Sequence, residues 1–593
     1  MVVQSDHTVL LEVDNPQYAE ARDALARFAE LEKSPEHIHT YRLSPLSLWN
    51  AAASGLGAEG IVESLVRYSK YDVPGNIQAD VRDYVSRFGR LKLRAGPAGE
   101  LLLSSDDPLL MLEVSRNRKV RQFIREEIDQ RTVRVDPALR GHIKKALVDI
   151  GFPAEDLAGY VDGEGLPLHL LPAMRANSEP FALRHYQQDA VEIFHALGSA
   201  RGGSGVIVLP CGAGKTLVGM GVMEKLQTNT LILTTNTVAV RQWMTELHDK
   251  TSLDPAEIGE YTGDVKEIKP VTVTTYQILT YRERRKRGAA AADAGSWFDD
   301  DFDGDDDELN QPLTPANFPH FGLFRERNWG LVIYDEVHLL PAPVFRMTAE
   351  LQARRRLGLT ATLVREDGKE DHVFALIGPK KFDVPWKDLE RQGWIATAHC
   401  HEIRLDMAPE QRLAYAMATP REQAVLSATD PAKLPVVEQL IAKHPDDQVL
   451  VIGTYLEQLS EVANRLDAPL LTGKTPTRER QKLYQQMREG ALRRLVVSKV
   501  ANFAVDLPDV SVAVEISGTF GSRQEEAQRL GRILRPKHDN RPAHFYAIVM
   551  RDTKDQDFGA KRQMFLTEQG YKYEILYRDD LPSYDPESDH AAW

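Results

Sequence analysis

The sequence predicts an α/β protein in which two parallel-sheet domains in tandem follow a smaller mixed α+β N-terminal region. Short β-branched apolar runs alternate with helical stretches from about residue 180 onward, which is typical of strands buried on both faces of a parallel sheet. One series comprises 206–209, 231–233, 271–273 and 331–334, and a second comprises 449–452, 495–497 and 512–514. We expect the two domains to be joined near residues 379–386.

The length and composition support several folded units. The chain has 593 residues, enough for about four domains at roughly 150 residues each. Hydrophobic residues make up 42% and charged residues 27%, so the chain can bury several cores and is not a disordered polymer. Only two cysteines occur, Cys211 and Cys400, which excludes a disulfide scaffold and a cysteine-based zinc or iron–sulfur site.

The boundaries that we predict divide the chain into five parts. These are 1–117, 118–177, 178–380 with an acidic insertion at about 282–319, 381–550, and a C-terminal extension over 551–593. The start of the chain lacks a basic segment followed by a long apolar one, and no apolar run approaches the ~18 residues of a membrane span. We therefore expect a cytoplasmic protein without membrane contact.

The strongest chemical motif is L-P-C-G-A-G-K-T, residues 209–216, placed between a strand and a helix. Gly212 and Gly214, on either side of Ala213, allow backbone N–H groups to turn toward a phosphate in front of a helix N-terminus. Lys215 is expected to reach the β- and γ-phosphates of ATP, and Thr216 to ligate Mg²⁺. The leading glycine of the general pattern is replaced by leucine. Cys211 fits either a small spacer or, less well, a redox-sensitive group.

A second motif, Asp335-Glu336-Val-His338, ends the apolar run 331–334. Carboxylates at the carboxyl edge of a parallel sheet point into the crevice where ligands bind. Asp335 is expected to hold Mg²⁺ through water, and Glu336 to orient and deprotonate the attacking water. His338 is expected to link this site to the next element. A surface ion pair is the alternative explanation of the two acids, and the phosphate-binding motif about 120 residues upstream argues against it.

A third motif, Q-R-L-G-R-I-L-R at 528–535, lies in the second α/β series. Arg532 and Arg535 are three residues apart, so a helix places both on one face. Two guanidinium groups aimed at one point can neutralise a phosphoryl group during its transfer. A solvated basic helix face is the alternative.

Together these blocks resemble the superfamily-two helicases, and their details resemble the XPB branch. The ordered series also includes L-R-H-Y-Q at 183–187, T-T-N-T at 234–237, T-T-Y-Q at 274–277, G-L-T-A-T-L-V-R-E-D at 358–367 and S-K-V-A-N-F-A-V-D-L-P at 498–508. The resemblance spans roughly residues 181–576. It implies two RecA-like domains that bind Mg-ATP between them.

The resemblance also implies roles for further residues. Arg184 and Gln187 correspond to an adenine-sensing segment, and Asp506 to the nucleotide side of the second domain. Segments that contact one DNA strand or couple it to hydrolysis contain Asn236, Thr275, Thr360, Thr362, Thr472, Ser498 and Gln528. Arg365, Glu366 and Asp367 form an element that the family ties to strand opening. Taken singly, the Ser and Thr residues are more typical of helix caps or loops. The three charged residues, taken alone, are typical of a turn.

Several segments depart from the family or match it loosely. The counterpart of the family's thumb-like insertion, near residues 411–426, is short and rich in alanine. The segment 293–308 holds nine acidic residues and no Lys or Arg. It is typical of a solvated loop, although its acids could also imitate phosphates in a DNA groove. The unit near 118–159 would be a damage-recognition module, with cations that a solvated face explains equally well: Arg116, Arg118, Lys119, Arg121, Arg125, Arg140, Lys144 and Lys145.

The function that we predict is an ATP-dependent 3′-5′ DNA helicase or duplex translocase of XPB type acting in DNA repair. Its substrate would be single-strand/duplex junctions or damaged duplex DNA, and we expect a nucleoid-associated monomer. The net charge of −14 does not exclude DNA, because a phosphate backbone responds to the local field. Two alternatives stay open: an RNA helicase, and an ATP-driven switch or scaffold that remodels a protein–DNA complex or presents a partner nuclease.

Overall fold

The computed structural model describes most of the chain. It does not describe residues 34–36, 98, 200, 282–317, 321, 342–343, 345–347, 350, 352–353, 363–369, 385, 499–509, 519–530, 532–540 and 581–593, nor the side chains of residues 477 and 565. The predicted roles of Arg365, Glu366, Asp367, Asp506, Gln528, Arg532 and Arg535 therefore lie outside the described residues, as does nearly all of the acidic insertion.

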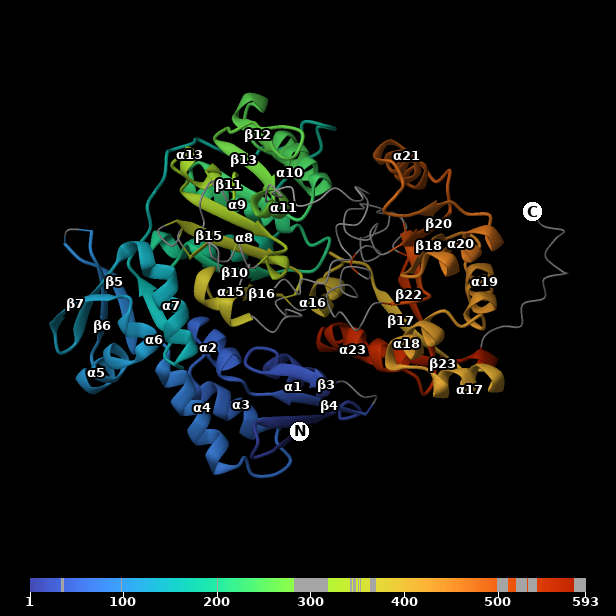
Figure 1. The fold of residues 1–593 in the computed structure, drawn as a ribbon, viewed down its shortest axis with the longest axis horizontal. Coiled ribbons are helices and arrows are strands. Elements are labelled where there is room, and N and C mark those ends of the chain that lie inside the picture. Colours follow the sequence, from blue (N-terminus) through green and yellow to red (C-terminus); the bar gives the residue numbers. More distant parts are fainter. Residues whose placement is uncertain are drawn as a thin grey trace, which may run out of the picture.

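Two seven-stranded parallel sheets confirm the predicted fold class (Figure 1). In the first sheet every paired strand is parallel to its neighbour, as crossover helices require. Its spatial order is β12 (Ile258–Tyr261), β13 (Val271–Thr275), β11 (Thr230–Thr234), β14 (Leu331–Asp335), β15 (Arg355–Thr360), β10 (Ser204–Val208) and β16 (Lys380–Asp383). The predicted boundary at residue 380 thus falls inside β16.

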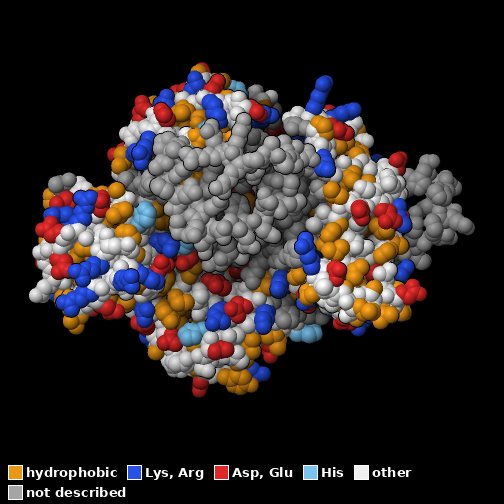
Figure 2. Space-filling model, in the orientation of Figure 1, with side chains coloured by type: hydrophobic (Ala, Val, Ile, Leu, Met, Phe, Trp, Pro, Cys, Tyr) orange, Lys and Arg blue, Asp and Glu red, His pale blue; other side chains and the backbone are white. Residues whose placement is uncertain are grey.

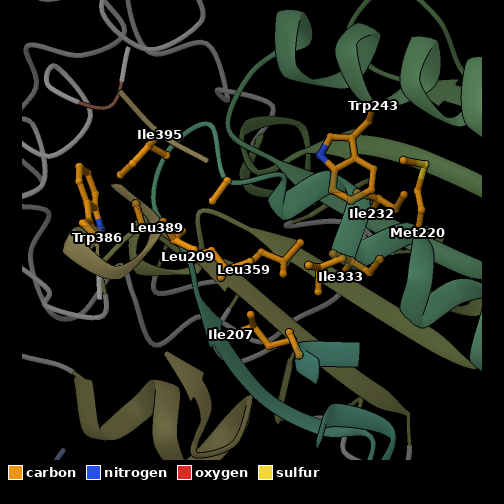
Figure 3. Close-up of a cluster of buried hydrophobic side chains, with 14 of the residues drawn as sticks. Ile207, Leu209, Met220, Ile232, Trp243, Ile333, Leu359, Trp386, Leu389 and Ile395 are labelled. Carbon is orange, nitrogen blue, oxygen red and sulfur yellow. The ribbon is translucent and has the colours of Figure 1, made fainter. Parts of the chain in front are cut away.

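Helices cover both faces of this sheet because its strands are apolar on both sides. Ile207 and Ile333 belong to one buried cluster, shown in Figure 3, whereas Val206 and Val332 belong to another on the opposite face. The helices are α8 (His185–His195), α9 (Lys215–Leu226), α10 (Thr237–Lys250), α11 (Tyr276–Thr280), α13 (Leu323–Glu326) and α15 (Glu370–Leu376).

The second sheet is also entirely parallel in its paired strands. Its order is β19 (Leu470–Leu471), β20 (Arg494–Ser498), β18 (Gln448–Gly453), β21 (Val510–Glu515), β22 (Ala543–Met550), β17 (Ala398–Leu405) and β23 (Tyr573–Tyr577). Its helices are α17 (Pro409–Met417), α18 (Pro420–Ala428), α19 (Lys433–Lys443), α20 (Leu456–Arg465), α21 (Thr477–Arg488) and α23 (Lys554–Glu568). The predicted extension after residue 550 thus supplies α23 and the edge strand β23. A short helix, α16 (Trp386–Arg391), connects the two sheets.

Two smaller sheets precede them. The first is antiparallel, in the order β1 (Val2–Val3), β2 (Thr8–Glu12), β4 (Ile38–Arg42) and β3 (Glu30–Lys33), and it packs with α1 (Tyr18–Leu25), α2 (Pro45–Ala53), α3 (Ala58–Tyr68) and α4 (Gly75–Arg87). The second has the order β7 (Ile124–Asp129), β8 (Thr132–Val135), β6 (Leu101–Ser105), β5 (Leu91–Ala95) and β9 (Ala154–Leu157), with α5 (Pro108–Arg116), α6 (Arg118–Arg121) and α7 (Arg140–Asp149). The predicted boundary at residue 117 falls inside this second unit.

Two of the cations predicted to face DNA in this second unit are buried. Arg140 and Lys144 are 5% and 7% exposed and pair with Asp156 at 2.6 and 3.1 Å. The exposed Lys and Arg side chains of the unit are visible at the left of Figure 2. Within the described part of the chain, no helix has the length and apolar character needed to cross a bilayer.

The N-terminal unit, residues 1–88, touches both large sheets. On one side, Trp49 lies with its ring centre 6.5 Å from that of Phe374, and the Lys380 backbone N–H donates to the side-chain oxygen of Asn50 at 3.1 Å. On the other side, β3 lies beside α23, and a Cβ on Gly570 would lie 2.1 Å from the guanidinium of Arg22. Residues 1–88 therefore bridge the two halves (Figure 1).

Candidate functional site

The phosphate-binding loop connects β10 to the first turn of α9. Gly212 and Gly214 both have φ of +81°, in the left-handed region that favours glycine. A side chain at position 214 would also put its Cβ 2.4 Å from Nε2 of Gln187. The loop therefore needs glycine at position 214 for its backbone conformation and for this close approach.

The segment ahead of α8 supports this loop. Tyr186 and Gln187 each donate a hydrogen bond of 2.8 Å to the carbonyl oxygen of Ala213. The Arg184 backbone N–H donates to Oε1 of Gln187 at 2.9 Å, and its guanidinium stacks on Trp394, 4.3 Å from the ring centre. The structure thus brings the predicted adenine-sensing residues against the loop.

Lys215 and Glu336 form an ion pair at the centre of the site. The Lys215 ammonium donates to Oε1 of Glu336 at 2.5 Å, and the two side chains are only 12% and 20% exposed. Burial alone favours the neutral form of each group, but the opposite charge of the partner outweighs it. The pKa of Lys215 is therefore raised and the pKa of Glu336 is lowered. Glu336 also has φ of +51°, a strained conformation that recurs at active sites.

Asp335, the last residue of β14, is held by two aromatic side chains. The indole N–H of Trp243 donates to Oδ2 of Asp335 at 2.9 Å, and the Tyr276 hydroxyl donates to its backbone carbonyl at 2.8 Å. Burial and the neighbouring Glu336 charge raise the pKa of Asp335 to about 6. The two acids of the motif thus have pKa values shifted in opposite directions, an arrangement typical of sites with divided roles.

The ends of β14 and β15 meet through His338. Nδ1 of His338 lies 2.7 Å from Oγ1 of Thr360, and both residues are buried. The Thr360 hydroxyl in turn donates to the Thr362 carbonyl. Three residues predicted to couple hydrolysis to movement therefore form one connected chain next to Glu336.

Most of the residues predicted to contact a DNA strand make hydrogen bonds within the protein. Oδ1 of Asn236 accepts from the N–H groups of residues 238 and 239 at 3.0 Å and caps α10, and the Thr275 side chain caps α11. Oγ1 of Thr472 accepts from the N–H of residue 474 at 3.2 Å. Ser498 ends β20, and its buried hydroxyl has no hydrogen-bond partner among the described residues. Helix capping alone accounts for the first two.

One described residue of the late motif reaches the phosphate-binding loop from the other half of the molecule. A Cβ on Gly531 would lie 2.2 Å from Cβ and 2.9 Å from Sγ of Cys211. Gly531 therefore packs directly against the half-buried Cys211 side chain, which lies between the two segments as a spacer.

The donors present fit a magnesium ion bound together with phosphates better than a metal site made of protein alone. In the described ranges no three His, Cys, Asp or Glu side chains are grouped as a metal site. Mg²⁺ commonly uses one or two carboxylates together with substrate phosphates. Oε2 of Glu336 is buried and makes no hydrogen bond in the described part of the chain, with Nδ1 of His338 3.5 Å away, so it can still accept a hydrogen bond from a bound water. Thr216 and Asp335 are the residues that could hold the ion.

Sequence reasoning missed the two tryptophans of the site. Trp243 occupies an apolar helical position, which is typical of a core residue, and Trp394 belongs to the segment between the domains. Neither carries a spacing signal that relates it to a residue about 90 to 210 positions away. A tryptophan that is fully buried must place its N–H on some acceptor, but the sequence does not say which.

Family models match three parts of the chain. Residues 389–590 match the ERCC3/RAD25/XPB C-terminal helicase, residues 180–365 the type III restriction enzyme res subunit, and residues 1–129 the helicase conserved C-terminal domain. The last match covers the N-terminal region, where β1 to β6 pair with one another in antiparallel fashion among the described residues.

Relatives match over almost the whole length. A protein described as DNA 3′-5′ helicase XPB from Mycobacterium tuberculosis is 53% identical over 581 residues, which cover 98% of this chain and 98% of the relative. A protein of the same description from Kineococcus radiotolerans is 51% identical and covers 99% and 98%. A putative DNA 3′-5′ helicase Rad25 from Halobacterium salinarum is 32% identical over 94% of this chain and 84% of the relative.

Proposed function

Since the chain belongs to the XPB family of DNA 3′-5′ helicases, we propose that it is an ATP-dependent 3′-5′ DNA helicase or duplex translocase acting in DNA repair. The similarity over nearly the full length of each relative supports the proposal for the whole chain. Its substrate would be a single-strand/duplex junction or damaged duplex DNA.

The observation that carries the proposal is that both halves of the molecule contribute residues at the phosphate-binding loop, in the region between them that we call the seam. The phosphate-binding loop and the paired Lys215 and Glu336 come from the first sheet, and Gly531 reaches the same loop from the second. A triphosphate bound at this loop would therefore contact both halves, so that the presence of the γ-phosphate would affect their closure.

The residues of the site divide the chemistry among them. Lys215 would release Glu336 and bind the β- and γ-phosphates, because both partners are anions that compete for one ammonium group. Glu336, once released, would accept a proton from the attacking water at its carboxylate. Thr216 and Asp335 would hold Mg²⁺, which when bound neutralises developing phosphate charge. Arg532 and Arg535 would add positive charge from the second half.

The remaining predictions concern movement and context. Asn236 and Thr275 in the first half and Thr472 and Ser498 in the second would grip one strand alternately as the seam opens and closes. We also propose a damage-recognition role for residues 118–177, which share a five-stranded sheet with β5 and β6, and a cytoplasmic monomer near the nucleoid. A partner nuclease would fit the same scheme, because strand opening exposes single strands that such an enzyme could cut.

A coupled assay of ATP hydrolysis and strand separation tests the function. Forked DNA with a 3′ tail, forked DNA with a 5′ tail and the corresponding RNA forks are compared, with Glu336→Gln as the inactive control. We expect hydrolysis and separation on the DNA fork with the 3′ tail. Stronger stimulation by RNA would favour an RNA helicase, and DNA-stimulated hydrolysis without separation would favour a switch or scaffold.

A further inference from the structure

We propose that Trp243 is a positioning residue that fixes the carboxylate of Asp335 for the metal ion of Mg-ATP. This inference rests on the proposed function, because it concerns the same nucleotide site. It adds a residue from α10 to a site that sequence motifs place on the loop before α9 and at the end of β14.

The indole is placed for this one hydrogen bond. Trp243 is 1% exposed, and its N–H lies 2.9 Å from Oδ2 of Asp335. Figure 3 shows the ring beside Met220 and Ile232, in the apolar cluster between α9 and the sheet. A ring packed on all sides has little freedom to turn, so its N–H direction is fixed and the carboxylate is fixed with it.

Glycine at position 219 makes room for the ring. Gly219 lies on α9, one turn after Lys215, and a Cβ there would lie 2.6 Å from Cη2 of Trp243. Any other residue at 219 would displace the indole or the helix. The close packing of α9 on the ring also ties the helix that begins at the phosphate-binding loop to the group that holds Asp335.

Tyr276 supports the same residue from a second direction. Its hydroxyl donates to the backbone carbonyl of Asp335 at 2.8 Å, and its side chain is 3% exposed. Trp243 lies on the helix capped by Asn236, and Tyr276 directly follows Thr275. Asp335 is thus held by side chains from the two segments of the first half that are predicted to contact DNA.

The chemistry explains why such support is useful. A carboxylate that ligates a metal through one oxygen or through water must keep one rotamer, and a hydrogen bond to its other oxygen holds it there. Partners that orient metal ligands in this way typically change metal affinity or activity by about 10- to 100-fold when removed. Phenylalanine at position 243 would remove the donor and keep most of the packing.

The test compares nucleotide binding with and without Mg²⁺. Calorimetry with the ATP analogue adenylyl-imidodiphosphate measures the Kd of the full-length protein in Mg²⁺ and in EDTA. We expect Trp243→Phe to weaken binding in Mg²⁺ by about 10-fold and to leave binding in EDTA unchanged. Trp329→Phe is the matched control, because Trp329 is equally buried in the same half but donates to the Leu323 carbonyl at 3.0 Å. An equal Kd for Trp243→Phe and the wild type in Mg²⁺ would overturn the proposal.

A second pair of variants displaces the ring instead of removing its donor. Gly219→Ala is expected to weaken Mg²⁺-dependent binding. Gly221→Ala, on the same helix α9, would place its Cβ 2.8 Å from Val191 of α8 and should leave this binding unchanged. If both alanine variants lose the same affinity, crowding of α9 explains the effect and the proposal fails. Wild type and Asp335→Asn distinguish a failure of the Trp243 proposal from a failure of the proposed function. If Mg²⁺ changes the Kd for the ATP analogue in neither protein, the proposed function itself is wrong.

Discussion

The ammonium nitrogen of Lys215 lies 2.5 Å from a carboxylate oxygen of Glu336, and these two side chains neutralise each other in a largely buried site. One belongs to the first turn of α9 and the other follows β14, 121 positions later. A phosphate that binds Lys215 must therefore separate the pair, and in doing so it frees the group proposed to activate water. In the proposed mechanism, this one contact would link phosphate binding to hydrolysis.

Replacing Lys215 by alanine should abolish nucleotide binding and destabilise the first half of the molecule. Removing one partner of a buried ion pair leaves an uncompensated charge, which typically costs about 3–5 kcal/mol. We expect the double variant Lys215→Ala/Glu336→Gln to regain stability but not binding. Thermal unfolding and calorimetry measure the two properties separately. A single variant as stable as the wild type would show that the pair contributes little.

Replacing Glu336 by glutamine should leave ATP binding intact and stop turnover. Glutamine keeps the shape of the side chain but cannot accept the proton of the attacking water, so hydrolysis should fall by about 10³-fold. Binding of a fluorescent ATP analogue and single-turnover hydrolysis measure the two steps. A hydrolysis rate near that of the wild type would assign the base to another residue.

Replacing Gly531 by alanine should impair closure of the seam. The new Cβ would lie 2.2 Å from Cβ of Cys211, so the two halves would have to separate. Misplacement on the scale of 1 Å can cost about 10²-fold in rate, while the loop itself should still bind nucleotide. Gly559→Ala is the control, since its Cβ meets no atom closer than 3.1 Å. If the seam is the cause, Cys211→Gly should restore part of the rate, and no restoration would contradict this explanation.

Replacing Arg532 by alanine should slow turnover by about 10³-fold with little change in ATP affinity, the scale of a lost arginine finger. The expected split arises because the guanidinium would act on charge that develops only during phosphoryl transfer. Steady-state kinetics give kcat and KM for the variant. An unchanged kcat would place this arginine outside the reaction.

Stability should fall as the pH is lowered from 6.5 toward 4. Burial, with the charges of His444, His399 and His401 nearby, lowers the pKa of His544 to about 4, whereas the unfolded chain has a value near 6.5. Between these values the unfolded state binds a proton that the folded state does not, so acid favours unfolding. His544 is half-buried, and we expect a loss of roughly 1 kcal/mol between pH 7 and pH 5.

Urea unfolding at the two pH values measures this loss. His544→Gln should flatten the dependence, whereas His37→Gln, at a side chain that is 74% exposed, should not. A profile of the same slope in His544→Gln and in the wild type would assign the acid sensitivity to other groups.

The sequence was a good guide wherever local spacing determines the geometry. Gly212 and Gly214 occupy a loop whose backbone conformation follows from the motif itself, Lys215 begins the helix behind that loop, and Asp335 ends its strand as the apolar run predicts. Packing across the molecule was not accessible in this way. The contact of Trp243 with Asp335 depends on how α10 lies on the sheet, which no local pattern states.

Boundaries were the other weak point. The five-stranded sheet joins β5 and β6 to strands beyond residue 117, because the edges of β6 and β5 are completed by β8 and β9. Composition shows no change at such a join. Likewise, Asn236 and Thr275 are predicted to contact DNA and in the structure cap helices, and a single sequence cannot separate the two uses of the same side chain.

The bridge formed by residues 1–88 has a mechanical consequence. A unit that contacts both halves cannot keep both contacts when the angle between the halves changes. The contact of residues 1–88 with the first half contains packed aromatic rings, whereas their contact with the second half includes the guanidinium of Arg22 against Gly570. We expect the contact with the second half to break first when the two halves move apart. The N-terminal unit would then resist this movement until that contact breaks, and afterwards would move together with the first half.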